Sequence, residues 1–162
     1  MSYKTIAGVI CPGYGIASET ATKSQTLVSN VYPDKREIVV DKTVFRQFPY
    51  FIQAGVEGLE HMRASTINVD ISPKVFLIRK PDYEITCEWI PGIKETFWLT
   101  KMQCEFNGVR YDAYNYYPCI SEQHVARNHM VEVITELIPG IAYGKDIVLH
   151  MDDVAVEVTN QK

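Results

Sequence analysis

The chain has 162 residues, an apolar fraction of 46%, a charged fraction of 22% and a formal net charge of −4. This length fits one domain, residues 1–162, that can bury a core without a metal or a disulfide. The composition excludes a disordered chain, and the charge gives no general basis for binding nucleic acid. No apolar run reaches the length of a membrane span, and the N-terminal stretch lacks the features of a secretory signal, so we expect a cytoplasmic protein with no membrane partner.

The first third of the chain mixes strand-like runs with turn residues. Residues 3–11 (YKTIAGVIC) predict a strand that runs into a Pro/Gly loop at 12–18 (PGYGIAS). Residues 30–42 carry a Pro-Asp turn and a short apolar strand. The mixed apolar spacing of residues 43–62 predicts a helix that is interrupted around Pro49.

The remainder of the chain is rich in β-branched and aromatic runs. These runs predict strands at 65–71, 74–80, 83–90, 96–106, 146–151 and 155–158. Asn107-Gly108, between two strand-like arms, predicts a tight hairpin turn. Residues 121–138 have helical spacing in part, although 131–135 alone would suit a strand. Together these elements predict a mainly β domain that closes into a barrel and has one or two short helices.

Four cysteines, Cys11, Cys87, Cys104 and Cys119, are scattered singly along the sequence. No C-x-x-C pair is present, so the cysteines suggest neither a zinc site nor a redox motif. Cys87 and Cys104 lie inside apolar strand-like runs, where a thiol packs as a small hydrophobic group. We therefore expect reduced thiols with structural roles.

The strand entrance Ser65-Thr66-Ile67-Asn68 is unusual, because Asn is poorly suited to a pleated strand. Successive side chains of a strand point to opposite faces, so Thr66 and Asn68 would lie side by side on one face. Two neutral oxygens then face one point. The alternative is structural, with Thr66 in cross-strand contacts and Asn68 capping a turn.

Five pieces of the sequence occur in the order seen in a known family. They are GVICPGYGIAS, STINVDI, YDAYNYYPCIS, MVEVITELIPGI and YGKDIVLHM. In this order they resemble the archaeal CTP-dependent riboflavin kinases, whose fold is a six-stranded cradle-loop barrel. They resemble more closely a related family of uncharacterised bacterial proteins. The resemblance spans most of the chain and implies a magnesium- and nucleotide-dependent kinase of a small molecule, with CTP or another nucleotide as co-substrate and an acceptor such as a flavin.

The resemblance also implies roles for individual residues. Thr66 and Asn68 match the residues that ligate the magnesium bridging the nucleotide phosphates, and hard oxygen ligands suit that ion. Glu132 matches an acidic residue near the bound flavin, which makes it the candidate catalytic base for a substrate hydroxyl. The alternative for Glu132 is a glutamate that faces solvent.

Three further residues are candidates for nucleotide binding. Gly13 and Gly15 would let the backbone approach a phosphate, although this loop carries fewer glycines than the kinases have and the sequence favours a structural turn there. Arg127 lies where the resemblance places the nucleotide and could pair with phosphate. Ser65 replaces the glycine that opens the family's strand motif, which could narrow the nucleotide cleft.

The tyrosines 111, 114, 116 and 117 could stack a flat ligand, but tyrosines in a hairpin more often pack on one sheet face.

The sequence leaves two functions open. One is the nucleotide-dependent kinase. The other is a non-catalytic barrel that binds a ligand or partner, favoured by the long segment 19–46 and the apolar stretch RQFPYFI, which could cover the cradle.

Overall fold

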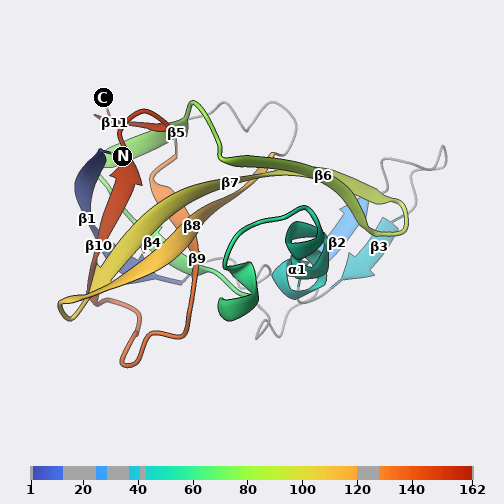
Figure 1. The fold of residues 1–162 in the computed structure, drawn as a ribbon, viewed down its shortest axis with the longest axis horizontal. Coiled ribbons are helices and arrows are strands. Elements are labelled where there is room, and N and C mark those ends of the chain that lie inside the picture. Colours follow the sequence, from blue (N-terminus) through green and yellow to red (C-terminus); the bar gives the residue numbers. More distant parts are fainter. Residues whose placement is uncertain (1, 13–24, 29–36, 41–42, 120–127, 162) are drawn as a thin grey trace.

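The computed structural model describes residues 2–12, 25–28, 37–40, 43–119 and 128–161, and it describes side chains in all of these except 25–28, 37–40 and 43 (Figure 1). Gly13, Gly15 and Arg127 lie outside the described residues. Strands dominate the described part of the chain.

Six antiparallel strands form a closed barrel. Their order around the barrel is β10 (Asp146–Asp152), β1 (Tyr3–Cys11), β4 (Ile67–Asp70), β9 (Met130–Thr135), β8 (Val109–Cys119) and β7 (Ile93–Phe106), and the pairing of β10 with β7 closes the ring. The predicted mainly β fold with a six-stranded barrel is therefore confirmed.

The other elements extend or cover this barrel. They are β6 (Tyr83–Ile90), which pairs with the first half of β7, the ribbons β5 (Lys74–Ile78) with β11 (Val156–Asn160) and β2 (Gln25–Val28) with β3 (Glu37–Val40), helix α1 (Thr43–Gln53) and the 3-10 turn η1 (Leu59–His61). Figure 1 shows β6 and β7 as a long arm that leaves the barrel, with α1 beneath it. The β5–β11 ribbon lies at the opposite end, near both termini.

Helix α1 departs from the prediction in two respects. It continues through Pro49 instead of breaking there, and it ends at Gln53, before the predicted end at residue 62. Proline inside a helix removes one hydrogen bond and costs about 3 kcal/mol. Three apolar side chains of α1, those of Val44, Phe48 and Phe51, are buried against the sheet. Packing of this face holds the helix together across the proline.

Of the two interpretations of residues 121–138, the strand at 131–135 is confirmed and the helical one is wrong there, because residues 130–135 form strand β9. Residues 120–127 lie outside the described part of the chain. The β-branched run from Val131 to Thr135 pairs with β4 on one side and β8 on the other. Pairing on both edges outweighs the helical spacing of the apolar residues.

The hairpin turn at Asn107-Gly108 is confirmed, with φ of 51° at Asn107 and 76° at Gly108. Two consecutive positive φ values are what a primed turn requires, and Asn-Gly is the pair that adopts them most easily. The turn fixes the register of β7 and β8 over eleven residue pairs, from Phe106↔Val109 to Thr96↔Cys119.

Buried side chains form two clusters, one on each face of the curved sheet. The interior cluster fills the barrel and includes Ile6, Val69, Cys104, Val133 and Leu149, together with residues of the β5–β11 ribbon. The helix-side cluster lies on the outer face, between the sheet and α1 and η1. It includes Phe51, Leu59, Phe97, Tyr116 and Ile134.

The hairpin tyrosines are divided between these clusters, so the expectation that they pack on one face is wrong. Tyr114 and Tyr116 belong to the helix-side cluster, whereas Tyr111 and Tyr117 pack against the interior cluster. Strand alternation explains the division, since Tyr116 and Tyr117 are consecutive. Cys87 and Cys104 are buried in strands, which confirms their predicted packing role.

Candidate functional site

Three of the predicted site residues meet on the outer face of the barrel. On β9, Val131 and Val133 belong to the interior cluster, so Glu132 points outward. Asn68 of β4 is its direct cross-strand partner. Residues directly opposite each other in an antiparallel pair share a face, so the amide of Asn68 lies beside the carboxyl of Glu132.

Thr66 completes this group. It precedes β4, and its hydroxyl donates a hydrogen bond to Oε1 of Glu132 at 3.5 Å. Glu132 lies 66 residues along the chain from Thr66, yet the β4–β9 pairing brings it beside both Thr66 and Asn68. We call this set the oxygen cluster.

The carboxyl of Glu132 is withdrawn from water although the residue as a whole is only partly buried. Burial raises the pKa of Glu132 from its ordinary value of 4.5 to about 7, and the hydrogen bond from Thr66 lowers it in part. Burial disfavours the charged form of a carboxyl, and one long hydrogen bond compensates little. The group can therefore hold or release a proton near neutral pH.

Helix α1 supplies the cover on one side of this face. The phenol of Tyr116 donates to Oε1 of Gln47 on α1 at 2.7 Å, and both residues are buried. The Tyr116 ring stacks on Phe97 with 5.8 Å between centroids, and Phe51 of α1 meets Phe97 edge-on at 5.2 Å. Burial raises the pKa of Tyr116 well above its usual value, and the nearby carboxyls of Glu132 and Glu95 add to this effect.

Glu95 also belongs to this face, although it was not among the site residues predicted from the sequence. It lies on β7 between Ile93 and Phe97, which are both buried in the helix-side cluster. Burial raises its pKa. The signal was available, because Ile93, Glu95 and Phe97 alternate along one strand and so must share a face. An acidic residue inside such an apolar alternation indicates a carboxyl with a special environment.

The end of β1 also lies beside the oxygen cluster. Cys11, the last residue of β1, is the cross-strand partner of Asn68, and its thiol donates to the Asn68 carbonyl oxygen at 3.6 Å. The chain therefore leaves the barrel next to Asn68 and enters the segment that contains Gly13 and Gly15.

The oxygen cluster fits the requirements of magnesium. It offers a hydroxyl, an amide and a carboxylate oxygen, which are hard ligands of the kind that magnesium binds. The oxygen cluster contains one carboxyl, and in the part of the chain that the structure describes no group of three or more His, Cys, Asp or Glu residues is placed to hold a metal ion.

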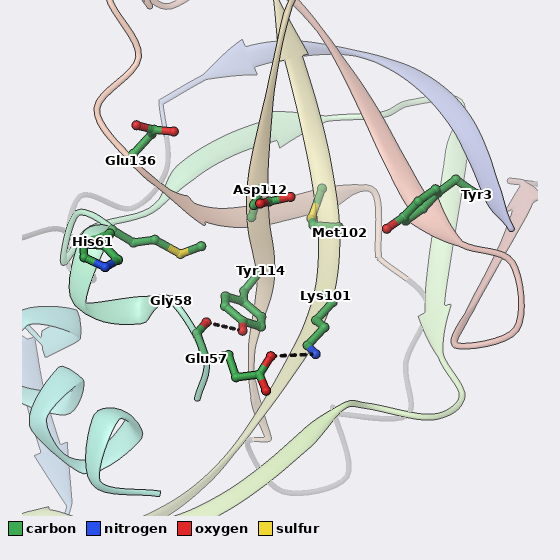
Figure 2. Close-up of a pocket in the computed structure, with 11 residues that line it drawn as sticks. Tyr3, Glu57, Gly58, His61, Lys101, Met102, Asp112, Tyr114 and Glu136 are labelled. Carbon is green, nitrogen blue, oxygen red and sulfur yellow. Dashed lines mark hydrogen bonds and ion pairs between the residues drawn. The ribbon is translucent and has the colours of Figure 1, made fainter. Parts of the chain in front are cut away.

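A separate pocket of about 440 Å³ lies between η1 and the outer wall of the β7–β8 hairpin (Figure 2). Its walls include Tyr3, Asp112 and Glu136. Glu57 and Lys101 form an ion pair there at 3.4 Å, and the phenol of Tyr114 donates to the Glu57 carbonyl oxygen at 2.5 Å. The predicted site residues that the structure describes, Thr66, Asn68 and Glu132, do not line this pocket.

Comparison with models of known protein families finds no match, and comparison with curated protein sequences finds none either. Among the described residues, no helix combines the length and the apolar character needed to cross a membrane.

Proposed function

We propose that the protein binds a nucleotide with magnesium and transfers a phosphoryl group to the hydroxyl of a small molecule. The observation that carries the proposal is the oxygen cluster, in which Thr66 and Asn68 lie against Glu132. The order of motifs, which resembles the CTP-dependent riboflavin kinases, supports CTP as the nucleotide and a flavin as one candidate acceptor.

The roles of the residues follow from their chemistry. Thr66 and Asn68 would hold the magnesium together with phosphate oxygens, and a bound magnesium would neutralise charge on those phosphates. Glu132 would accept a hydrogen bond from the acceptor hydroxyl and orient its oxygen. This oxygen forms a bond to the terminal phosphorus, the bond from that phosphorus to the bridging oxygen breaks, and the nucleoside diphosphate leaves. The hydroxyl proton passes to the Glu132 carboxylate.

A second candidate function is ligand or partner binding without catalysis. The apolar stretch RQFPYFI forms most of α1, and its Phe48 and Phe51 are buried in the helix-side cluster. The segment thus covers the outer face beside the oxygen cluster, as expected for a barrel whose cradle has been filled.

Calorimetric titration separates these functions. The kinase proposal predicts that CTP or ATP binds only with magnesium, and that riboflavin is phosphorylated when both are present. Glu132→Gln should lower the transfer rate by about 10²–10⁴-fold, the usual contribution of a catalytic base, and retain nucleotide binding. The exposed Glu136, which directly follows the same strand, provides the control variant Glu136→Gln. Riboflavin binding without any nucleotide binding would support the non-catalytic function instead.

A further inference from the structure

The pocket between η1 and the outer wall of the β7–β8 hairpin has no part in the proposed function (Figure 2). Its volume of about 440 Å³ lies within the range of small-molecule sites, about 300–1,000 Å³. Figure 2 shows that its walls come from distant parts of the chain, with Tyr3 on β1, Glu57 before η1, His61 in η1, Asp112 on β8 and Glu136 after β9. The pocket is therefore a feature of the complete fold, and its lining indicates what it can hold.

Part of the wall is apolar or aromatic. Met102 and Ala113 are buried in the sheet, and Met62, which directly follows η1, is partly buried. The ring of Tyr114 is buried as well, and its phenol is held by the hydrogen bond to the Glu57 carbonyl oxygen. A fixed aromatic ring and two thioethers are polarisable groups that contact hydrocarbon and organic cations favourably. This part of the wall suits the apolar portion of a ligand.

The charged side chains of the pocket are mainly acidic. Carboxylates are supplied by Glu57, Asp112 and Glu136. The ammonium of Lys101 pairs with the first of these, Glu57, at 3.4 Å. Within the described residues, Asp112 and Glu136 take part in no ion pair. With the imidazole of His61 uncharged, the pocket therefore carries two negative charges that no cation of its wall compensates.

The carboxylate of Asp112 is held in place without being neutralised. Its Oδ1 accepts a hydrogen bond from Nε2 of Gln103 at 2.8 Å, which fixes the side chain and leaves its charge. The cations nearby have other contacts, because Lys101 is in its ion pair and the guanidinium of Arg110 lies 5.8 Å from the centroid of the Tyr3 ring. A carboxylate can only accept hydrogen bonds, and the donors that bind it most strongly are positively charged. A ligand that completes the contacts of Asp112 is therefore a cation.

We propose that this pocket binds a small organic amine, with its ammonium group on Asp112 and its apolar part against the Tyr114 ring and the methionines. The two uncompensated carboxylates would repel an anion. A bare metal ion fits less well, because no group of three or more His, Cys, Asp or Glu residues in the described part of the chain is placed to hold one. The amine site is separate from the oxygen cluster, whose residues do not line the pocket, so the proposal stands apart from the kinase function.

Titration of the full chain with phenethylamine tests the proposal, at about pH 8, where an alkylamine is charged and an imidazole is neutral. Nuclear magnetic resonance of methionine methyl groups reports on it, because the chain has only five methionines. With ¹³C-methyl methionine, Met62→Leu and Met151→Leu assign the two required signals by elimination. The Met62 signal should shift in a saturable manner, since the ring of the probe would lie beside it. The signal of Met151, which is buried in the barrel interior, should stay in place.

The variant Asp112→Asn tests the role of the charge. It should weaken the affinity for phenethylamine by about tenfold or more, which is the factor expected for one hydrogen bond between charged groups. Asparagine keeps the acceptor for Gln103, so the fold should survive, and an unchanged melting temperature checks this. Asp146→Asn is the matched control, because it removes an exposed aspartate of β10 that does not line the pocket, and it should leave the affinity unchanged.

Phenethyl alcohol, in which a hydroxyl replaces the ammonium group, separates a cation site from a merely apolar pocket. It should bind the wild type about tenfold more weakly than the amine or worse. A Met62 signal that does not respond to phenethylamine would overturn the proposal. So would equal affinity for the amine and the alcohol, or equal affinity for the amine in Asp112→Asn and the wild type. Displacement of the amine by an equal concentration of magnesium or calcium ions would show a site for inorganic cations instead.

Discussion

The two faces of the curved sheet carry different chemistry. The interior face is apolar apart from three neutral polar residues, Thr100, Asn115 and Thr135, of which Thr100 and Asn115 are direct cross-strand partners. The helix-side face holds two carboxyls with raised pKa values, those of Glu95 and Glu132.

The difference follows from how each face is closed. Six strands enclose the interior on all sides, and the β5–β11 ribbon contributes to the same cluster. A charge there would meet a large desolvation cost. The outer face is covered mainly by one helix and one turn, α1 and η1. The carboxyls of Glu95 and Glu132 on this face are buried enough to raise their pKa values, but both residues keep part of their surface exposed. The interior therefore supplies stability, and the helix-side face supplies reactive groups.

The largest change in stability should come from removing Phe51, a buried ring of helix α1 on the helix-side face. Phe51→Ala removes a fully buried ring of α1 and should lower the free energy of unfolding by about 3–5 kcal/mol. Because it loosens the cover, it should also lower the pKa of Glu132 toward its ordinary value. Urea denaturation and ¹³C resonance titration of the glutamates measure the two effects.

Leu149→Ala is the control on the other face. It should cost about 2–5 kcal/mol, because Leu149 is fully buried in the barrel, and it should leave the pKa of Glu132 unchanged. An equal change of that pKa in both variants would mean that the two faces are not independent.

The next effect is the pH dependence of stability in the absence of magnesium. Glu132 has a pKa of about 7 in the folded protein, against 4.5 as its ordinary value, so the folded state retains the proton over this interval. The free energy of unfolding should therefore fall as the pH rises from about 4.5 to about 7, by at most about 3 kcal/mol, and then level off.

Glu132→Gln removes this titration. The variant should be more stable than the wild type above pH 7 and should lack the corresponding slope in urea denaturation followed across pH. Glu136→Gln, at an exposed position, should retain the slope. A slope that persists in Glu132→Gln would show that another group causes it.

A smaller effect distinguishes polar groups on the two faces. In the described part of the structure, Thr100 Oγ1 and both polar side-chain atoms of Asn115 are buried without a hydrogen-bond partner. Replacing both residues with apolar ones, Thr100→Val with Asn115→Leu, should raise the free energy of unfolding by about 1 kcal/mol. Tyr116→Phe should act in the opposite direction and cost about 1–3 kcal/mol, because it leaves Gln47 Oε1 without its donor.

Thermal melting of these variants tests whether buried polar groups destabilise the interior face and stabilise the helix-side face. If the interior double variant melts earlier than the wild type, then Thr100 and Asn115 are satisfied by a buried water, and the interior is less apolar than its side chains indicate.

Local signals in the sequence were sufficient for much of the fold. Asn107-Gly108 predicted the central hairpin, and the β-branched runs predicted the barrel strands, because turn geometry and strand packing depend on neighbouring residues. Helix α1 was only partly predictable. Its continuation through Pro49 depends on burial against strands that are distant in the sequence.

The site depended still more on distant contacts. Strand alternation predicted that Thr66 and Asn68 share a face, and their contact with Glu132 is consistent with it. That contact itself depends on the β4–β9 register, which no local pattern reveals. Glu95 differs, because the alternation of residues 93, 95 and 97 is visible in the sequence. Its burial could not be predicted from that alternation, since it depends on helix α1 covering that face.

The most direct test of the oxygen cluster is calorimetric titration of CTP, with and without magnesium, into the double variant Thr66→Val and Asn68→Val. Valine suits a strand, so the fold should survive and the melting temperature should change little. Thr86→Val with Thr96→Val removes an exposed hydroxyl pair on β6 and β7 and serves as the control. The account predicts that magnesium-dependent CTP binding is lost in the first variant and retained in the control. Early melting of the first variant together with unchanged CTP binding would contradict it.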